Sequence, residues 1–193
     1  QMRLRINEQA ARVKAHWARL LSTLILGGAT GVCYDGQYFF DTDHSEGDSG
    51  TLSNKISVDI SALAVANHGV ITSPSPEEMV ACILLAIQQM FGFKDDRGEP
   101  INETAKKFLV MVPTGLWSAA IAAAKSTTFG GGATNVMLQL DGYSVEVAHN
   151  ARLTFTDTFP VFRADGDTKP FILQEEIPIE IKAIAEGSTL RLS

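Results

Sequence analysis

The chain has 193 residues, of which 45% are hydrophobic and 20% are charged. This is the composition of a globular protein, and it excludes a chain that is disordered throughout. The formal net charge is −6, from 16 basic and 22 acidic residues. Apart from a group in the first twenty positions the basic residues are scattered, which argues against a nucleic-acid-binding domain.

The two cysteines, Cys33 and Cys82, are too few for a disulfide framework, and their spacing fits no zinc pattern, so we expect two free thiols. The longest apolar run, residues 20–28, is far shorter than the roughly 20 residues of a membrane-spanning helix. No signal peptide is visible. Because the chain begins at Gln1 and ends just after strand-like sequence, we expect a fragment or a processed product.

The first predicted element is a long helix over residues 2–26, ended by Gly27 and Gly28. Its apolar residues recur at steps of three and four: Ile6, Ala10, Val13, Trp17, Leu20 and Leu24. Asp35-Gly36 then predicts a turn between two β-prone stretches. Residues 41–53 are polar and predict a surface loop, and residues 54–66 fit either a strand or a short helix.

A second helix has a complete set of start signals. Ser75 suits the N-cap, Pro76 the first helical position, and Glu78 completes a capping box. The apolar residues of 79–91 cover more than half of the helix circumference, so we expect it to be largely buried until it ends at Gly92.

Residues 108–112 predict a short buried strand, ended by Pro113. Thr114 is the expected cap of an alanine-rich helix over 115–125. Residues 126–135, with three consecutive glycines, predict a mobile loop.

The last third is rich in β-formers and predicts strands over 136–140, 143–148 and 153–155. Residues 159–163 and 169–174 flank Asp165-Gly166-Asp167 and predict a hairpin. Ile177, Ile179 and Ile181 alternate with polar residues and predict a strand with one apolar face. Helices and strands neither alternate strictly nor segregate, so the predicted fold class is α+β.

No group of residues predicts a reaction site. One loop gathers acidic residues and a histidine, but it lacks the register of a calcium loop and is interpreted as solvated: Asp41, Asp43, His44, Glu46 and Asp48. The glycines 130–132 follow a helix, whereas a phosphate loop precedes one. The sequence therefore predicts no catalytic, cofactor-binding or metal-binding residue and no cofactor.

Other reactive side chains are interpreted structurally. The four histidines, His16, His44, His68 and His149, are far apart in sequence, and no nucleophile motif surrounds either cysteine. Glu175 and Glu176 are neighbours in a strand-like stretch and should point to opposite faces. Cys82, Trp17 and Trp117 are expected to pack in the interior.

Four segments in order resemble Mu-like phage major head subunits. Cys33-Tyr34-Asp35-Gly36 with Phe39-Phe40 and His44 resembles the family's CYDG…FF…H block. The other three are residues 108–116, 145–153 and 169–175, which resemble its strand-to-helix step, its "VVVNPRL" stretch and its "KPFI.Q" segment. The resemblance covers essentially the whole chain.

This resemblance implies the tailed-phage major capsid protein fold, with a peripheral lobe that contains a long spine helix and an axial lobe with helices around a mixed sheet. Residues 1–60 and 154–193 would form the peripheral lobe and residues 61–153 the axial lobe. The glycine loop would lie near a symmetry axis. Family subunits are longer at both ends, and their terminal segments make many contacts between subunits.

The function implied is a structural, non-enzymatic subunit that self-assembles into an icosahedral phage head around double-stranded DNA. Implied partners are further copies, in pentamers and hexamers, with scaffold, protease and portal proteins, without sequence-specific DNA contacts or a membrane. The implied location is the virion, with the host cytoplasm during assembly. Two alternatives stay open: a shell that holds cargo protein, and an α+β enzyme or small-molecule-binding domain.

Overall fold

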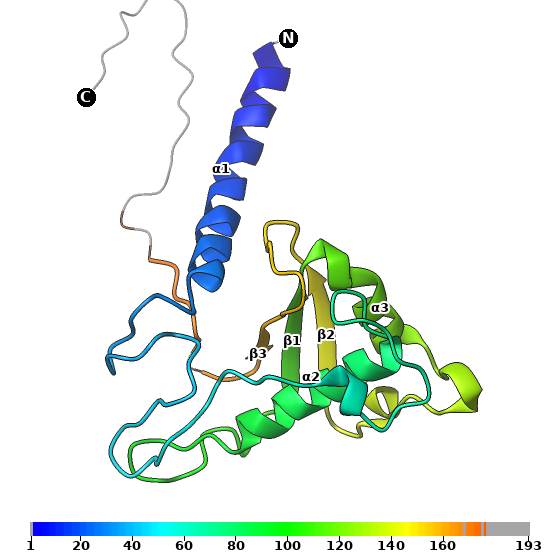
Figure 1. Ribbon diagram of the computed structural model, residues 1–193. Helices are drawn as coiled ribbons and strands as arrows, with labels where there is room; N and C mark the ends of the chain where they lie inside the picture. The colour runs from blue at the N-terminus through cyan, green and yellow to red at the C-terminus, as the bar shows by residue number, and fades with distance from the viewer. Residues whose placement is uncertain (1, 168, 175, 177–193) are drawn as a thin grey trace, which may run out of the picture.

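The computed structural model describes residues 2–167, 169–174 and 176, and in this part of the chain helices and strands are mixed (Figure 1). The elements in chain order are α1 (Met2–Leu26), the 3₁₀ turn η1 (Ile60–Ala62), α2 (Pro76–Phe91), β1 (Lys107–Val112), η2 (Thr114–Leu116), α3 (Trp117–Lys125), η3 (Gly130–Gly132), η4 (Val136–Gln139), β2 (Ser144–His149) and β3 (Val161–Arg163). The predicted strand around Ile177, Ile179 and Ile181 lies outside the described residues.

Helix α1 confirms the predicted helix over residues 2–26 and projects from the rest of the structure (Figure 1). Near its C-terminal end, Ile25 is fully buried and Ser22 is almost so. The Asn150 amide donates to the Ser22 hydroxyl over 3.0 Å, which ties this end to the turn after β2. The helix is thus anchored to the body through its last turns.

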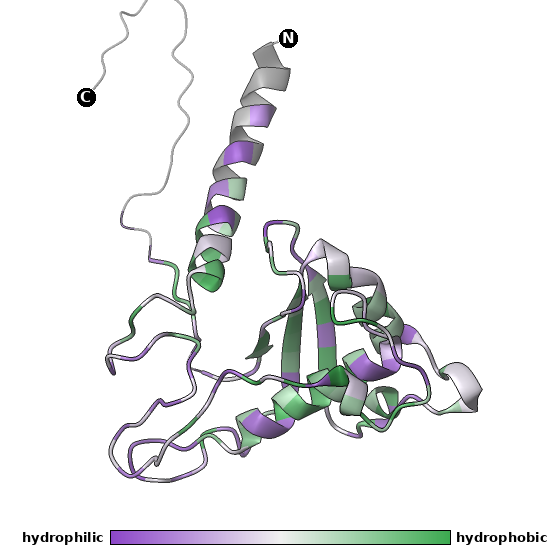
Figure 2. Cartoon of the chain, in the orientation of Figure 1, coloured by the Kyte–Doolittle hydropathy of each residue, from purple (hydrophilic) through white to green (hydrophobic). Residues whose placement is uncertain are grey.

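The body is built on a three-stranded sheet in the order β2-β1-β3. β1 pairs with β2 in parallel, with Phe108 opposite Val145, and with β3 in antiparallel, with Val110 opposite Val161. α3 connects the two parallel strands. Because β1 is central, Phe108, Val110 and Val112 are buried, and Figure 2 shows that most of the strand is apolar.

The core lies between this sheet and the two shorter helices, and it contains Met79, Val80, Ile83, Ile87, Ala105, Phe108, Val110, Val112, Leu116, Ala119, Ala120, Ala123 and Met137. Four residues of α2 belong to it, Met79, Val80, Ile83 and Ile87. Leu85 and Phe91 are exposed, so the predicted burial of α2 holds for the face that packs on the core and not for these two residues. None of the described helices is long and apolar enough to cross a membrane.

The N-terminus of α2 forms as predicted. Ser75 Oγ accepts from the Glu78 amide over 3.1 Å, and the Glu78 carboxylate accepts from the Ser75 amide over 2.7 Å. Pro76 is the first helical residue, and Gly92 ends the helix. Glu77 and Glu78 also hold the preceding loop, since their carboxylates accept from the backbone amides of residues 66, 67 and 69.

The prediction that Thr114 caps the alanine-rich helix is wrong. The chain enters α3 through η2 without a side-chain cap, and Thr114 Oγ1 instead lies 3.0 Å from His149 Nε2 at the end of β2. The parallel pairing of β1 and β2 brings these two residues together, a contact that local sequence does not encode. Trp117 is 45% exposed and stacks edge-on to His149, so its predicted place in the interior is also wrong.

Several predicted strands do not form in the described chain. Where a strand was predicted over 136–140, residues 136–139 form η4, because Asn135 Oδ1 accepts from the Met137 amide and fixes a helical turn. Residues 153–155 and 169–174 pair with no strand, so the predicted hairpin is reduced to β3. Residues 32–40 form one bridge, between Val32 and Tyr38, and residues 54–66 form only η1.

Candidate functional site

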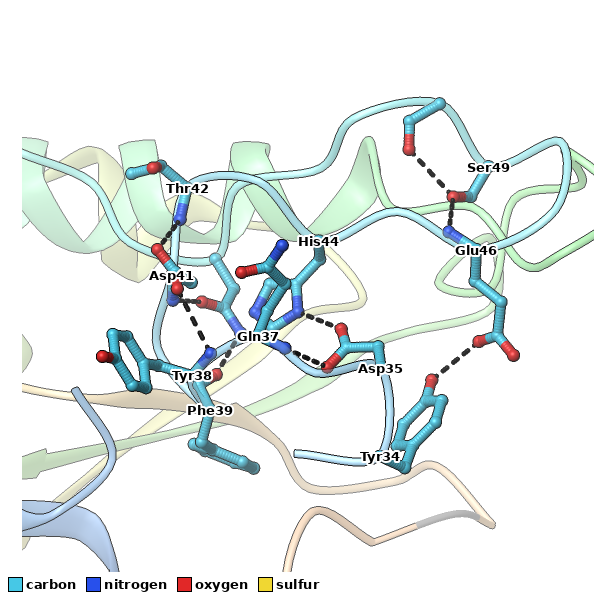
Figure 3. Close-up of polar contacts among 12 residues, drawn as sticks. Tyr34, Asp35, Gln37, Tyr38, Phe39, Asp41, Thr42, His44, Glu46 and Ser49 are labelled. Carbon is cyan, nitrogen blue, oxygen red and sulfur yellow. Dashed lines mark hydrogen bonds and ion pairs between the residues drawn. The ribbon is translucent and has the colours of Figure 1, made fainter. Parts of the chain in front are cut away.

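The segment that follows α1, residues 28–54, is a polar loop held together by hydrogen bonds of its own side chains (Figure 3). We call it the latched loop. Its start is fixed by two backbone bonds, from the Phe40 amide to the Gly28 carbonyl and from the Phe39 amide to the Gly31 carbonyl. Gly28 is required here, because a Cβ atom at this position would lie 2.5 Å from the Phe40 ring. The aromatic pair is thereby held against the end of α1.

Asp35 and His44 form the centre of this loop. Asp35 lies in the predicted turn, in which Gly36 has a positive φ of 84°. Its carboxylate accepts from the Gln37 amide over 3.1 Å and lies 2.6 Å from His44 Nδ1 (Figure 3). The bond to His44 lowers the pKa of Asp35 below its ordinary value. Two residues of the CYDG…H block, Asp35 and His44, therefore form one latch across a nine-residue separation.

A second latch closes the loop around Asp41. Its carboxylate accepts from the Thr42 amide over 2.8 Å and from the Tyr38 amide over 3.2 Å, and these bonds lower its pKa. Asn54 completes the closure, because its side chain accepts from the Asp41 amide and donates to the Phe39 carbonyl. The two latches explain how a segment without strands keeps a defined shape.

The acidic residues of this loop are used for such internal bonds or face solvent. Glu46 accepts from the Tyr34 hydroxyl over 2.8 Å, and this bond raises the pKa of Tyr34. Asp43 and Asp48 are exposed. Within the described residues, no group of three or more His, Cys, Asp or Glu side chains is placed to hold a metal ion.

The histidines that the sequence singled out have separate partners. His44 contacts Asp35, His68 lies 2.9 Å from the buried Glu78, and His149 contacts Thr114. His16 stacks on the partly buried Trp17. Cys33 and Cys82 are free thiols, as predicted, and burial raises the pKa of both. Glu175 lies outside the described residues.

The glycine-rich loop, residues 126–135, is held by hydrogen bonds that its composition does not predict. Asn135, at its end, is fully buried, and its amide donates to the carbonyls of Ala123 and Ser126 over 2.7 Å each. Thr128 and Thr134 form a bridge across the loop. Asn135 could have indicated this structure from the sequence, because asparagine is a frequent turn and capping residue.

Two grooves border α2. The larger, about 590 Å³, lies between α2 and the segment 51–63 and is lined by both polar and apolar side chains. The smaller, about 310 Å³, lies between α2 and the strand β2, with Phe91 and Tyr143 at its wall.

Comparisons with known proteins agree with this picture. Residues 2–66, which include α1 and the latched loop, match the family model of the Mu-like prophage major head subunit gpT. The predicted resemblance to Mu-like phage head subunits is confirmed over these residues, which hold the CYDG…FF…H block. The latches around Asp35 and Asp41 therefore lie within the part of the chain that this family model describes.

The fold is similar to that of the solved "Bacteriophage JBD30 capsid", with 19% sequence identity and a TM-score of 0.58. The likeness covers 77% of this chain and 67% of that chain. It confirms the predicted tailed-phage capsid fold. No curated protein is significantly similar in sequence.

Proposed function

We propose that the chain is a structural subunit of a phage head that self-assembles with further copies of itself into an icosahedral shell around double-stranded DNA. The observation that carries this proposal is the combination of the head-subunit family match over residues 2–66 with a capsid fold across the structure. The role is structural and requires no chemistry, which agrees with side chains that are engaged in latches and caps.

The acidic composition suits such a shell. A net charge of −6 opposes tight binding to packaged DNA, which carries one negative charge per ~1.7 Å of duplex. We propose that DNA is enclosed without sequence-specific contacts. Scaffold, protease and portal proteins are the proposed further partners, and the proposed locations are the virion and, during assembly, the host cytoplasm.

Two lobes are proposed, with residues 1–60 and 154–193 in the peripheral lobe and 61–153 in the axial lobe. The distribution of buried residues supports this division, because the main core is formed by residues between Met79 and Met137. β3 follows the proposed boundary at residue 154 and pairs with β1, so the two proposed lobes are joined through this strand.

Electron microscopy with sedimentation of the complete gene product tests the proposal. We expect shells, or rings of five and six subunits. A small monodisperse species at high concentration, with scaffold protein present, would contradict it and would favour the alternative of a ligand-binding domain.

A further inference from the structure

Two glutamates in the first turn of α2 are buried, Glu77 almost fully and Glu78 completely. A buried carboxylate is costly unless hydrogen bonds satisfy it. One oxygen of Glu77 accepts from the Ala66 and Asn67 amides over 2.8 and 3.2 Å, and the other accepts from the Asn67 side chain over 3.3 Å. Glu77 therefore holds the start of the loop that precedes α2, residues 66–75.

Glu78 holds the rest of loop 66–75. One of its oxygens accepts from the Gly69 and Ser75 amides over 2.9 and 2.7 Å, and the other lies 2.9 Å from His68 Nδ1. Burial raises the pKa of Glu78, but the hydrogen bonds that it accepts outweigh this and lower the pKa below its ordinary value. The carboxylate is therefore ionised at neutral pH and accepts at both oxygens.

The tip of loop 66–75 is apolar and exposed. Val70 and Ile71 are 63% and 54% exposed. Two backbone hydrogen bonds between Val70 and Ser73, over 3.2 and 2.7 Å, close the turn that presents them. Gly69 fits this turn closely, because a Cβ atom there would lie 2.4 Å from the Ser73 carbonyl oxygen. The two aliphatic side chains therefore project from a fixed backbone, which reduces the entropy that a binding contact would cost.

This fixed loop does not serve the core of its own subunit. None of residues 66–75 is buried, and none belongs to the main hydrophobic core. The loop lies beside the start of α2, on the side of the structure away from α1 (Figure 1). Two buried carboxylates thus fix the shape of a surface loop with an aliphatic tip, and a fixed shape of this kind favours a contact with another molecule.

The smaller groove, between α2 and β2, has matching chemistry. Its walls include Leu84, Phe91, Tyr143 and Val145, and none of the described residues that line it is charged. The rings of Phe91 and Tyr143 are partly exposed and pack edge-on, with centroids 6.1 Å apart. Leu84 lies eight residues after Pro76, which is about 12 Å along the helix axis. Because the loop is tied to the first turn of α2, its tip is kept away from the groove of its own subunit.

We propose that loop 66–75 of one subunit docks in the groove between α2 and β2 of a second copy, with Val70 and Ile71 against Phe91 and Tyr143. The loop contains no Asp, Glu, Lys or Arg, so the contact buries aliphatic groups against aromatic rings without desolvating a charged pair. It uses different surfaces on the two subunits, and such contacts generate rings where the rotation closes. The inference rests on the proposed head-subunit function, in which identical subunits meet.

Paired substitutions in the complete gene product test the contact. V70D/I71D places two charges at the loop tip. V32D/I101D makes the same replacements at positions that are 67% and 49% exposed, and it is the matched control. Circular dichroism checks that each variant folds, and sedimentation measures association. We expect V70D/I71D to associate about tenfold or more weakly than the wild type, and the control to associate normally. If V70D/I71D associates no more weakly than the control, the docking contact is wrong.

A cross-link tests which surfaces meet. Subunits with Ile71→Cys are mixed with subunits with Tyr143→Cys, assembled and oxidised, since a disulfide requires Cβ atoms about 4 Å apart. We expect a covalent dimer on a non-reducing gel. A mixture of Ile101→Cys with Tyr143→Cys measures the background from the native thiols Cys33 and Cys82. Shells without a cross-link above this background would refute the contact and leave the head function standing, whereas a wild type that never assembles would contradict the proposed function itself.

Discussion

Replacement of Asn135 by alanine should destabilise the body of the protein strongly, although the residue follows a glycine-rich loop. Its fully buried side chain makes three hydrogen bonds, to the Ala123 and Ser126 carbonyls and from the Met137 amide. A hydrogen bond contributes about 1 kcal/mol net, and a buried group left without its partner costs about 1–3 kcal/mol. We expect Asn135→Ala to lower the free energy of unfolding by about 3 kcal/mol.

Urea unfolding followed by circular dichroism measures this loss as a shift in midpoint at constant slope. Asn54→Ala is the matched control, because Asn54 also bonds backbone groups through its side chain but is exposed. Water can replace its bonds, so its loss should stay near 1 kcal/mol or below. Equal effects of the two substitutions, or a loss below about 1 kcal/mol for Asn135→Ala, would refute the view that this residue fixes the loop.

Three further predictions concern the loops and the cap. Gly47→Ala should lower the midpoint of thermal unfolding more than Gly50→Ala does. Both glycines have positive φ, but only at Gly47 would the new Cβ meet a backbone oxygen, that of Asp96, at 2.2 Å. An equal loss for both substitutions would argue against this close approach. Ser75→Ala should cost about 1 kcal/mol in urea unfolding through loss of the α2 cap, and an unchanged midpoint would contradict the capping role. The bond from Arg163 lowers the pKa of Asp165 from 3.8 to about 2. The stability that the ionised Asp165 contributes is therefore complete above pH 4 and is lost as the pH falls toward 2. Acid unfolding should therefore be less steep for Asp165→Asn than for Asp141→Asn, and identical acid profiles would show that Asp165 does not supply this dependence.

The elements that sequence predicted correctly are those with local signals. α1 has an unbroken helical stripe, α2 has Ser75, Pro76 and Glu78 at fixed spacing, and β1 is a short apolar run that ends at a proline. Each depends on residues within a few positions of one another. The turn at Gly36 was predicted for the same reason.

The elements that sequence missed depend on distant partners. Thr114 contacts His149, 35 residues away, in place of capping a helix. Asp165, predicted as part of a hairpin turn, accepts instead from the Lys106 amide, 59 residues away. The prediction of a strand over 136–140 failed because β-formers there are held in a helical turn by Asn135. The latch of Asp35 and His44 lay inside a recognised block, but residue type alone did not reveal that the two side chains meet.

Cryo-electron microscopy of particles assembled from the complete gene product tests the central claim most directly. We expect closed shells in which the sheet β2-β1-β3 and the long helix α1 repeat in rings of five and six. Particles that lack this repeat, or a product that stays monomeric at every concentration with scaffold protein present, would contradict it.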